Sequence, residues 1–255
     1  MINVLEGINP VTRILGLILL TTPLLLSVDV VSAGVALAFT VLAAPFCGVS
    51  WGRLLRRGWP VLLAAPLAAI PMALYGRPEG ETYAQFLFAH VTDNSLQLAA
   101  AIFVRVLAVG LPVIVLSADV DPTDLGDGLA QVLRLPERFV LGAVAAARLV
   151  SLFRDDLDSM RRARRARGIA DQGRIRYFLT LAFGLLVLSL RRGAKLATAM
   201  EARGFNRVAE HGRTWARESS LSARDWIVMA VCLVVSVASI GIAVAVGSFR
   251  FLGVA

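Results

Sequence analysis

Lysine is almost absent from this chain of 255 residues, because Lys195 is the only one and arginine supplies the other basic side chains. A P-loop, G-x-x-x-x-G-K-[ST], needs a lysine directly after a glycine to reach the phosphates of a bound nucleotide. Lys195 follows an alanine, so the sequence carries no P-loop. The chain is therefore not itself a P-loop ATPase, and any ATP that drives it must bind to another chain.

Cysteine and histidine are also scarce, at two residues each. Cys47 and Cys232 both lie in apolar segments and match no spacing typical of a disulfide or a zinc site. His90 and His211 are isolated from each other in the sequence. We therefore expect no metal site, and we interpret the two cysteines as small core residues.

Charged residues make up only 17% of the chain, whereas hydrophobic residues make up 57% and the mean hydropathy is +0.72. A soluble domain is roughly half apolar, so this composition indicates a membrane protein. A helix needs about 17–25 mostly apolar residues to cross a bilayer. The runs predicted to do so are 11–28, 30–50, 59–76, 95–117 and 226–247. The first run is not expected to be a cleaved signal peptide, because Glu6 precedes it and a second full run follows it.

The basic residues are distributed unevenly along the chain. Residues 51–58 carry three arginines and no acid, residues 77–94 carry three acids and one arginine, and residues 118–224 hold 19 of the 26 basic and 12 of the 18 acidic residues. Segments rich in Lys and Arg stay in the cytoplasm. We therefore expect a cytoplasmic N-terminus, a membrane domain with four spans (1–117), the cytoplasmic region 118–224, and a final span and tail (225–255) with an extracytoplasmic C-terminus.

A short amphipathic helix is predicted at the start of the cytoplasmic region, in "DVDPTDLGDGLAQVLRL". Asp121 can cap this helix, Pro122 suits its first position, and Asp124 faces the positive end of the helix dipole. The apolar face would consist of Leu125, Leu129, Val132 and Leu133.

A long helix is predicted from Pro136 onward. Apolar residues recur there at spacings of four and three, the pattern of one continuous packing face: Phe139, Ala143, Ala146, Val150, Phe153, Leu157 and Met160. The same spacing leads to Arg164 and Arg167, so Arg167 is predicted to continue the buried face. The remaining arginines of "RRARRAR", which are Arg161, Arg162 and Arg165, are expected to bind anionic lipid or to pair with Asp155, Asp156 and Asp158 one turn back.

A second long helix is predicted to begin near Arg174 and to end in the same way. Its packing face runs through Leu196, Ala199 and Met200 to Arg203. Its apolar stretch, residues 177–190, is short for a span and is interpreted as lying under or partly in the membrane. Glycines follow both arginines, at Gly168 and Gly204, where helices commonly end in a left-handed residue. Either arginine alone could simply complement a helix dipole. The repetition favours capture of a partner's carboxylate instead.

Arg105 lies near the middle of the run 95–117, which contains no acid to compensate it. A charged side chain at the centre of a membrane costs about 2.5–3.5 kcal/mol on insertion scales. Arg105 is therefore predicted to be a structural clamp that bonds to a carbonyl freed by a proline or to a polar group on a neighbouring helix. The alternatives are a surface that contacts a partner, or a position near the membrane interface.

Four stretches carry a family resemblance over nearly the whole chain: "INPVTRILGLILL", "SADVDPTDLGDGLAQVLRLPERF", "RARRARG" and "AMEARGF". They resemble the transmembrane T component of energy-coupling factor (ECF) transporters, the family of the EcfT and CbiQ proteins. The two Ala-Arg-Gly motifs are the most specific part of the match. The fold class that follows is an all-α integral membrane protein with about five transmembrane helices and long cytoplasmic coupling helices.

The resemblance implies a non-catalytic scaffold of an ABC-type importer in the plasma membrane of a prokaryote. Each coupling helix would insert a motif arginine into one of two ATPase subunits, and the membrane part would hold a substrate-binding S component. The cargo would be a vitamin such as biotin, or a metal ion such as cobalt or nickel. ATP would bind to the ATPases, so this chain needs no cofactor, and no nucleic acid partner is expected. The implied coupling residues are Ala166, Arg167, Gly168, Ala202, Arg203 and Gly204.

Two other classes of protein fit the sequence less well. A secondary transporter or channel should show an inverted repeat or carboxylates within its spans, and the sequence has neither. A membrane-embedded lipid-modifying enzyme is suggested by Asp124, Asp127 and Gly128, which begin like the metal signature of lipid phosphatidyltransferases. The later carboxylates of that signature are replaced by Ala146 and Val150, so these acids are interpreted as caps and turn residues.

Overall fold

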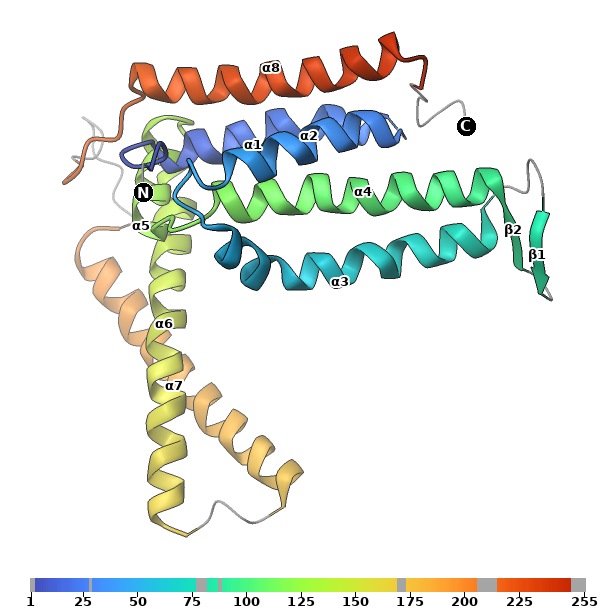
Figure 1. Cartoon of the computed structure of the whole chain (residues 1–255). Coiled ribbons are helices and arrows are strands. Elements are labelled where there is room, and N and C mark those ends of the chain that lie inside the picture. Colours follow the sequence, from blue (N-terminus) through green and yellow to red (C-terminus); the bar gives the residue numbers. More distant parts are fainter. Residues whose placement is uncertain are drawn as a thin grey trace. The chain divides into compact units, whose positions relative to one another are not determined.

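The computed structural model describes residues 3–27, 29–76, 82–86, 89–168, 173–205 and 215–248. The elements are α1 (Pro10–Leu25), α2 (Val30–Ala43), α3 (Trp51–Tyr75), β1 (Thr82–Phe86), β2 (Ala89–Thr92), α4 (Asp93–Leu116), α5 (Pro122–Gln131), α6 (Glu137–Ala166), α7 (Arg174–Ala202) and α8 (Ala223–Ala245). The strands form one antiparallel hairpin, which the sequence did not predict. The predicted all-α membrane fold is confirmed (Figure 1).

The chain divides into two compact units. The first contains Met1–Asp121 and Ser220–Ala255, and the second contains Pro122–Ser219. In the first unit, α3 packs against α4, α1 against α8, and α2 against α4 and α8. The last helix therefore belongs to the same unit as the first four helices (Figure 1).

Four helices in the described part of the chain are long and apolar enough to cross a membrane: Trp51–Tyr75, Asp93–Leu116, Ile175–Ala202 and Ala223–Ala245. Three of these cover nearly all of a predicted span, namely the runs 59–76, 95–117 and 226–247. The runs 11–28 and 30–50 instead form the shorter apolar helices α1 and α2, of 16 and 14 residues. By length and composition α7 also qualifies, because it extends well beyond the apolar stretch 177–190.

The early end of α2 has a local cause. Pro45 has no N–H, so the carbonyl of Val41 loses its usual partner four residues on. The indole Nε1 of Trp51 donates to that carbonyl at 3.3 Å, from the first residue of α3. The proline therefore ends α2 before the predicted boundary at residue 50, and the tryptophan satisfies the carbonyl that is left.

One buried carboxylate joins the starts of two membrane helices. Asp225, which is 1% exposed, accepts hydrogen bonds from the backbone N–H of Asn9 at 2.8 Å and of Ser222 at 2.7 Å. These residues are the N-caps of α1 and α8. A negative charge is stabilised at a helix N-terminus. Asp225 therefore holds the starts of α1 and α8 together.

Cations mark the same end of this unit. The guanidinium of Arg13 donates to the carbonyl of Ala118 at 3.0 Å and also to that of Leu5. Arg57, in the second turn of α3, pairs with Asp119 at 3.5 Å. The start of α1, the start of α3 and the end of α4 therefore meet here, which is the end that the charge distribution predicts to be cytoplasmic.

The second unit contains α5, α6 and α7. The predicted helix at residues 121–133 is present as α5, but its most buried residues are small: Gly126, Gly128 and Ala130. A Cβ atom placed on Gly126 would lie 2.2 Å from Cγ2 of Val144 on α6. The small residues thus allow α5 and α6 to approach closely, which the leucine pattern did not reveal.

We expect Gly126→Ala to destabilise the packing of α5 on α6 by about 1–3 kcal/mol, because neither backbone nor Val144 can move away cheaply. The thermal unfolding midpoint of the purified protein should fall. Gly142→Ala on α6 is the matched control, because nothing lies within 4 Å of the added atom. Combining Gly126→Ala with Val144→Ala should recover most of the loss, and a double variant as unstable as the single one would contradict the assignment of the clash.

Candidate functional site: two matching helix ends

The ends of α6 and α7 have nearly the same backbone. Arg167 is the C-cap residue of α6, with φ −88° and ψ 3°, and Arg203 is that of α7, with φ −85° and ψ 6°. The next residues, Gly168 and Gly204, have φ 67° and 79°. Only glycine adopts such left-handed values at little cost. The predicted ends of both helices are therefore correct to the residue.

Hydrogen bonds stabilise these turns. The N–H of Gly204 donates to the carbonyl of Glu201 at 2.9 Å, and that of Phe205 donates to the carbonyl of Met200 at 3.0 Å. This pair of bonds is the Schellman motif, which satisfies carbonyls that a helix end leaves unpaired. At the end of α6, the N–H of Gly168 donates to the carbonyl of Arg165 at 3.1 Å, the equivalent of the first of these bonds. The backbone thus presents each motif arginine in the same way.

Both motif arginines are exposed, and neither side chain makes a hydrogen bond or ion pair with another described residue. The prediction that Arg167 continues a buried face is therefore wrong within this chain. The half-buried stripe of α6 consists of Phe153, Leu157, Met160 and Arg164, and stops one turn earlier. The reason is that α7 covers only this part of α6. Phe139, at the other end of the predicted stripe, is 79% exposed.

Polar contacts fix α6 and α7 in an antiparallel crossing. Arg164 donates to the hydroxyl of Thr180 at 2.7 Å and to its carbonyl at 2.9 Å, and lies 5.7 Å from the ring centre of Tyr177. Two turns earlier on α6, Asp156 pairs with Arg192 at 2.8 Å. These contacts lie on both sides of the crossing point, so they resist sliding of one helix along the other.

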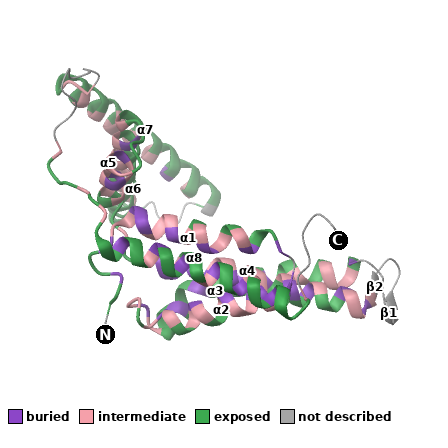
Figure 2. Cartoon of the chain, turned by 90° about the horizontal axis from the view of Figure 1, so that it is seen from above, coloured by how far each residue is buried: buried purple, intermediate pink, exposed green. Residues whose placement is uncertain are grey.

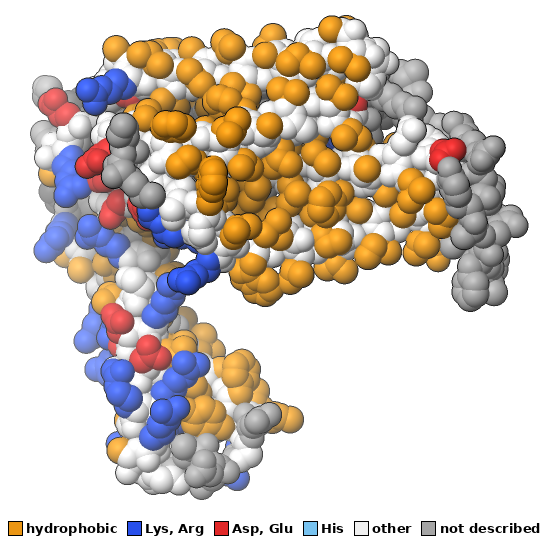
Figure 3. Space-filling model, in the orientation of Figure 1, with side chains coloured by type: hydrophobic (Ala, Val, Ile, Leu, Met, Phe, Trp, Pro, Cys, Tyr) orange, Lys and Arg blue, Asp and Glu red, His pale blue; other side chains and the backbone are white. Residues whose placement is uncertain are grey.

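The crossing point itself is tightly packed. A Cβ atom on Gly184 would lie 2.5 Å from the terminal methyl of Met160. Glycine here lets the two helices approach, as at Gly126. Of the predicted ion pairs within α6, Arg161 does pair with Asp158 at 3.5 Å, but Asp156 is taken by α7. Figure 3 shows basic side chains over α6 in this unit, beside a hydrophobic cluster.

The segment that leaves this unit is bound to α5. The side-chain amide of Gln131 donates to the carbonyl of Arg217 at 2.9 Å and accepts from the N–H of Ser219 at 2.8 Å. Asp124 pairs with Arg217 at 2.7 Å. Sequence reasoning gave Asp124 only a role at the helix start and gave Gln131 none. An amide that pairs with the backbone of a distant connecting segment leaves no pattern in the sequence, so this contact could not be predicted.

Arg105 lies on α4 and donates through a guanidinium nitrogen to the carbonyl of Leu24. Leu24 belongs to the last turn of α1, where carbonyls have no helical partner. We expected a carbonyl freed by a proline or a polar group on a neighbouring helix. The partner is a carbonyl of a neighbouring helix, and the end of that helix, not a proline, leaves it free. Asp29, the N-cap of α2, is 6% exposed and acts electrostatically on Arg105. The compensating acid thus comes from another helix.

A substitution at Gly168 tests the left-handed turn. Gly168→Ala should cost roughly 1–2 kcal/mol at the end of α6, because an L-residue is strained at this φ although no atom lies within 4 Å of the added carbon. The matched control is Gly193→Ala inside α7, which also meets no atom and should stabilise the helix by up to about 1 kcal/mol. Hydrogen exchange near residue 168 should accelerate only in the first variant. If Gly168→Ala left the stability of the protein unchanged or raised it, the assignment of a left-handed turn at this residue would be contradicted.

Comparison with known proteins decides the family. The model of the CbiQ family, described as cobalt transport protein, matches residues 1–215. The chain belongs to this family. It is similar to the curated energy-coupling factor transporter transmembrane protein EcfT of Brevibacillus brevis, with 27% identity over 242 residues and 90% of each chain covered. The EcfT proteins of Acidaminococcus fermentans (25% identity; 90% of this chain and 91% of the relative) and Thermanaerovibrio acidaminovorans (28% identity; 81% and 78%) are also similar.

The predicted family is therefore confirmed. The chain is the T component of an ECF transporter, a multi-pass membrane subunit of a transport system. The described residues place the two Ala-Arg-Gly motifs at equivalent ends of the two longest helices in the chain's second unit.

Proposed function

We propose that the chain is the energy-coupling scaffold of an ECF importer, in which two ABC-type ATPase subunits bind to the ends of α6 and α7. The observation that carries this proposal is the repetition of one geometry: an exposed C-cap arginine followed by a left-handed glycine, 36 residues apart. Two like sites suit two like partners. A planar guanidinium can bind a carboxylate through two parallel hydrogen bonds, which gives orientation as well as affinity.

The crossing of α6 and α7 suits the transmission of movement. A subunit that pushes on Arg167 or Arg203 displaces the helix that carries it only if that helix does not slide along its neighbour. The contacts of Arg164 with Thr180 and of Arg192 with Asp156 prevent such sliding. Movement of an ATPase is thus passed along the crossed pair to a membrane-embedded S component that carries a vitamin or a metal ion.

The orientation follows from charge. The arginine-bearing ends of α6 and α7 lie on the cytoplasmic side, the N-terminus is cytoplasmic, and the C-terminus is extracytoplasmic. ATP binds to the partner subunits, since this chain has no P-loop. The protein works in the plasma membrane of a prokaryote, and selects its cargo through the S component.

The test is co-purification. The full chain should be coexpressed with the two ATPases and the S component of its own organism, and captured in mild detergent through a tag on this chain. We expect both ATPases in the captured material, and ATP-dependent uptake by vesicles that contain the complete set. Uptake by this chain alone, driven by an ion gradient, would instead support a secondary transporter. Lipid turnover by the purified chain would support a lipid-modifying enzyme.

A further inference from the structure

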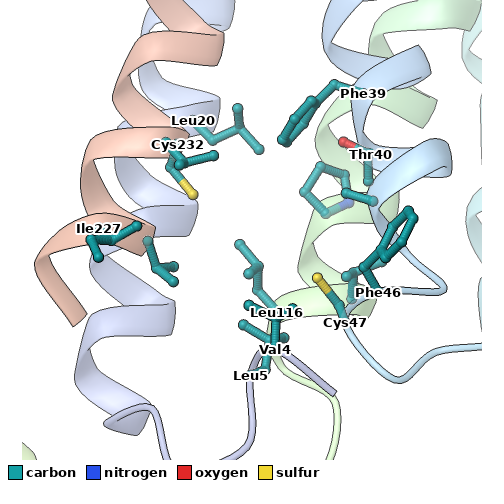
Figure 4. Close-up of a pocket in the computed structure, with 15 residues that line it drawn as sticks. Val4, Leu5, Leu20, Phe39, Thr40, Phe46, Cys47, Leu116, Ile227 and Cys232 are labelled. Atoms are coloured by element: carbon teal, nitrogen blue, oxygen red, sulfur yellow. The ribbon is translucent and has the colours of Figure 1, made fainter. Parts of the chain in front are cut away.

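A cavity of about 240 Å³ opens among α1, α2, α4 and α8, all in the first unit (Figure 4). Phe39 and Phe46 lie on one side of it, and Leu20, Ile227 and Cys232 on the other, with Leu116 between them. Such a space is larger than the cavity of about 150 Å³ that takes up benzene in an engineered protein interior. It is therefore large enough for a flexible apolar chain.

The lining of the cavity is almost entirely apolar. Its polar groups are the hydroxyl of Thr40, which already donates to the carbonyl of Ala36 at 2.8 Å, and the thiols of Cys47 and Cys232. No charged residue lines it. A vitamin or a hydrated ion would lose its hydrogen bonds to water there and gain none. The cavity thus excludes polar cargo and favours hydrocarbon.

The mouth of the cavity is formed by side chains that the protein leaves uncovered. Val4 is 52% exposed, Phe46 60% and Ile227 61%. These residues belong to the unit that carries the membrane helices α3, α4 and α8, where the surrounding medium is lipid. An acyl chain is the apolar molecule at highest concentration next to this opening.

A cation lies one helical turn from the mouth. On α8, Arg224, Ile227, Val228 and Val231 follow the spacing of one helix face, and the last three line the cavity. Arg224 is exposed and makes no ion pair with another described residue. Trp226, two residues further along α8, is 62% exposed, as is common for tryptophan at the level of lipid headgroups. An arginine at this depth can bind a phosphate while hydrocarbon continues into the cavity.

We propose that this cavity binds one acyl chain of a phospholipid whose phosphate pairs with Arg224. The lipid fills the space between the start of α8 and the end of α2, and so acts as part of the helix packing at this end of the membrane unit. The proposal concerns the first unit alone and does not depend on the proposed coupling function.

The direct test uses a phosphatidylglycerol that carries a photoreactive diazirine near the end of one acyl chain. The full chain, in nanodiscs that contain this lipid, is irradiated, digested and mapped by mass spectrometry. We expect cross-links concentrated on the cavity lining. Ala43→Phe, which fills the cavity from α2, should reduce them several-fold, whereas Leu42→Phe, at a neighbouring residue that is 65% exposed, should not. Arg224→Gln should also reduce them.

The native cysteines give a second measurement that needs no bulky substitution. In a Cys232→Ala background, a membrane-permeable maleimide should modify Cys47 several-fold more slowly in phospholipid nanodiscs than after removal of lipid by a short-chain detergent. The reverse experiment, with Cys232 in a Cys47→Ala background, should give the same result. Both thiols line the cavity, so one occupant protects both.

Four outcomes would contradict the proposal. Cross-links spread evenly over exposed lipid-facing residues would show only the lipid that surrounds any membrane protein. Cavity cross-links that vanish when the complete transporter is assembled would show that a partner's side chain is the occupant. Cross-links unaffected by Arg224→Gln would contradict the pairing of the lipid phosphate with Arg224. Thiol reactivity that does not depend on lipid would contradict an acyl chain in the cavity.

Discussion

A protein with both Arg167→Ala and Arg203→Ala should reach the membrane in normal amounts and yet fail to support ATP-dependent uptake. Both side chains are exposed and make no hydrogen bond or ion pair with another described residue, so their removal should leave the fold of this chain intact. Under the proposed function, the loss falls on the interfaces that the two arginines would form with the ATPases. Uptake is measured in vesicles at matched expression, next to ATP hydrolysis by the same vesicles.

The expected size of this effect follows from the chemistry of the contact. Removing one partner of a buried, hydrogen-bonded charge pair costs about 2–5 kcal/mol, and each 1.4 kcal/mol is about tenfold in affinity. Each single variant should therefore weaken binding of one ATPase by about 30-fold or more. The double variant should be worse than either single one, because under the proposed function the two helix ends bind different subunits.

A matched control is available on the same helix. Arg161 is also an exposed arginine of α6, but it lies more than one turn before the helix end. Arg161→Ala, which removes a 3.5 Å surface pair with Asp158, should change uptake little. Arg167→Lys keeps the charge but loses the planar, two-pronged donor, so it should stay well below wild type. Wild-type uptake by the double variant at equal expression would end the coupling proposal.

The helix ends at the candidate site were predictable because their signals are local. Pro122 at the start of α5, and the glycines that follow Arg167 and Arg203, act on their own turns and need no partner. The same is true of the family signature, since the two motifs are contiguous. Local chemistry in the sequence therefore located the candidate residues.

The packing between elements was less predictable. The apolar spacing of α6 extended to Arg167, but the structure buries this face only as far as Arg164, where Thr180 of α7 meets it. Which turn of one helix meets which turn of another depends on close contacts such as Gly184 with Met160. Apolar spacing in a sequence therefore predicts which face of a helix is packed. It does not predict how many turns of that face a neighbouring helix buries, which Figure 2 shows by the colouring of buried and exposed residues.

The partner of Arg105 was hidden for the same reason. The sequence shows no acid within residues 95–117, and a search along one helix cannot find a charge on another. Asp29 caps α2 by accepting from the N–H of Ser32 at 2.6 Å, and its charge also acts on Arg105 of α4. Arg105 in turn binds the last turn of α1 through Leu24. Three helices therefore meet around one arginine.

Arg105→Leu should reduce the yield of folded protein and its assembly with partner subunits. It removes the donor to the carbonyl of Leu24, and a hydrogen bond that involves a charged group contributes about 1.5–3 kcal/mol. It also removes a positive charge that interacts electrostatically with the buried carboxylate of Asp29. Arg105→Lys keeps the charge but has a shorter reach and no planar fork, so it should show a smaller loss.

A double-mutant cycle separates the charge from the packing. Asparagine caps a helix about as well as aspartate, so Asp29→Asn removes the charge while α2 keeps its cap. Arg105→Leu leaves the negative charge of Asp29 without the positive charge that interacts with it. Adding Asp29→Asn should therefore restore part of the lost thermal stability, so the effects of the two substitutions should not be additive. Strictly additive losses would show that Asp29 and Arg105 act independently. Normal yield and normal uptake with Arg105→Leu alone would show that the arginine does not clamp α4 to α1 at all.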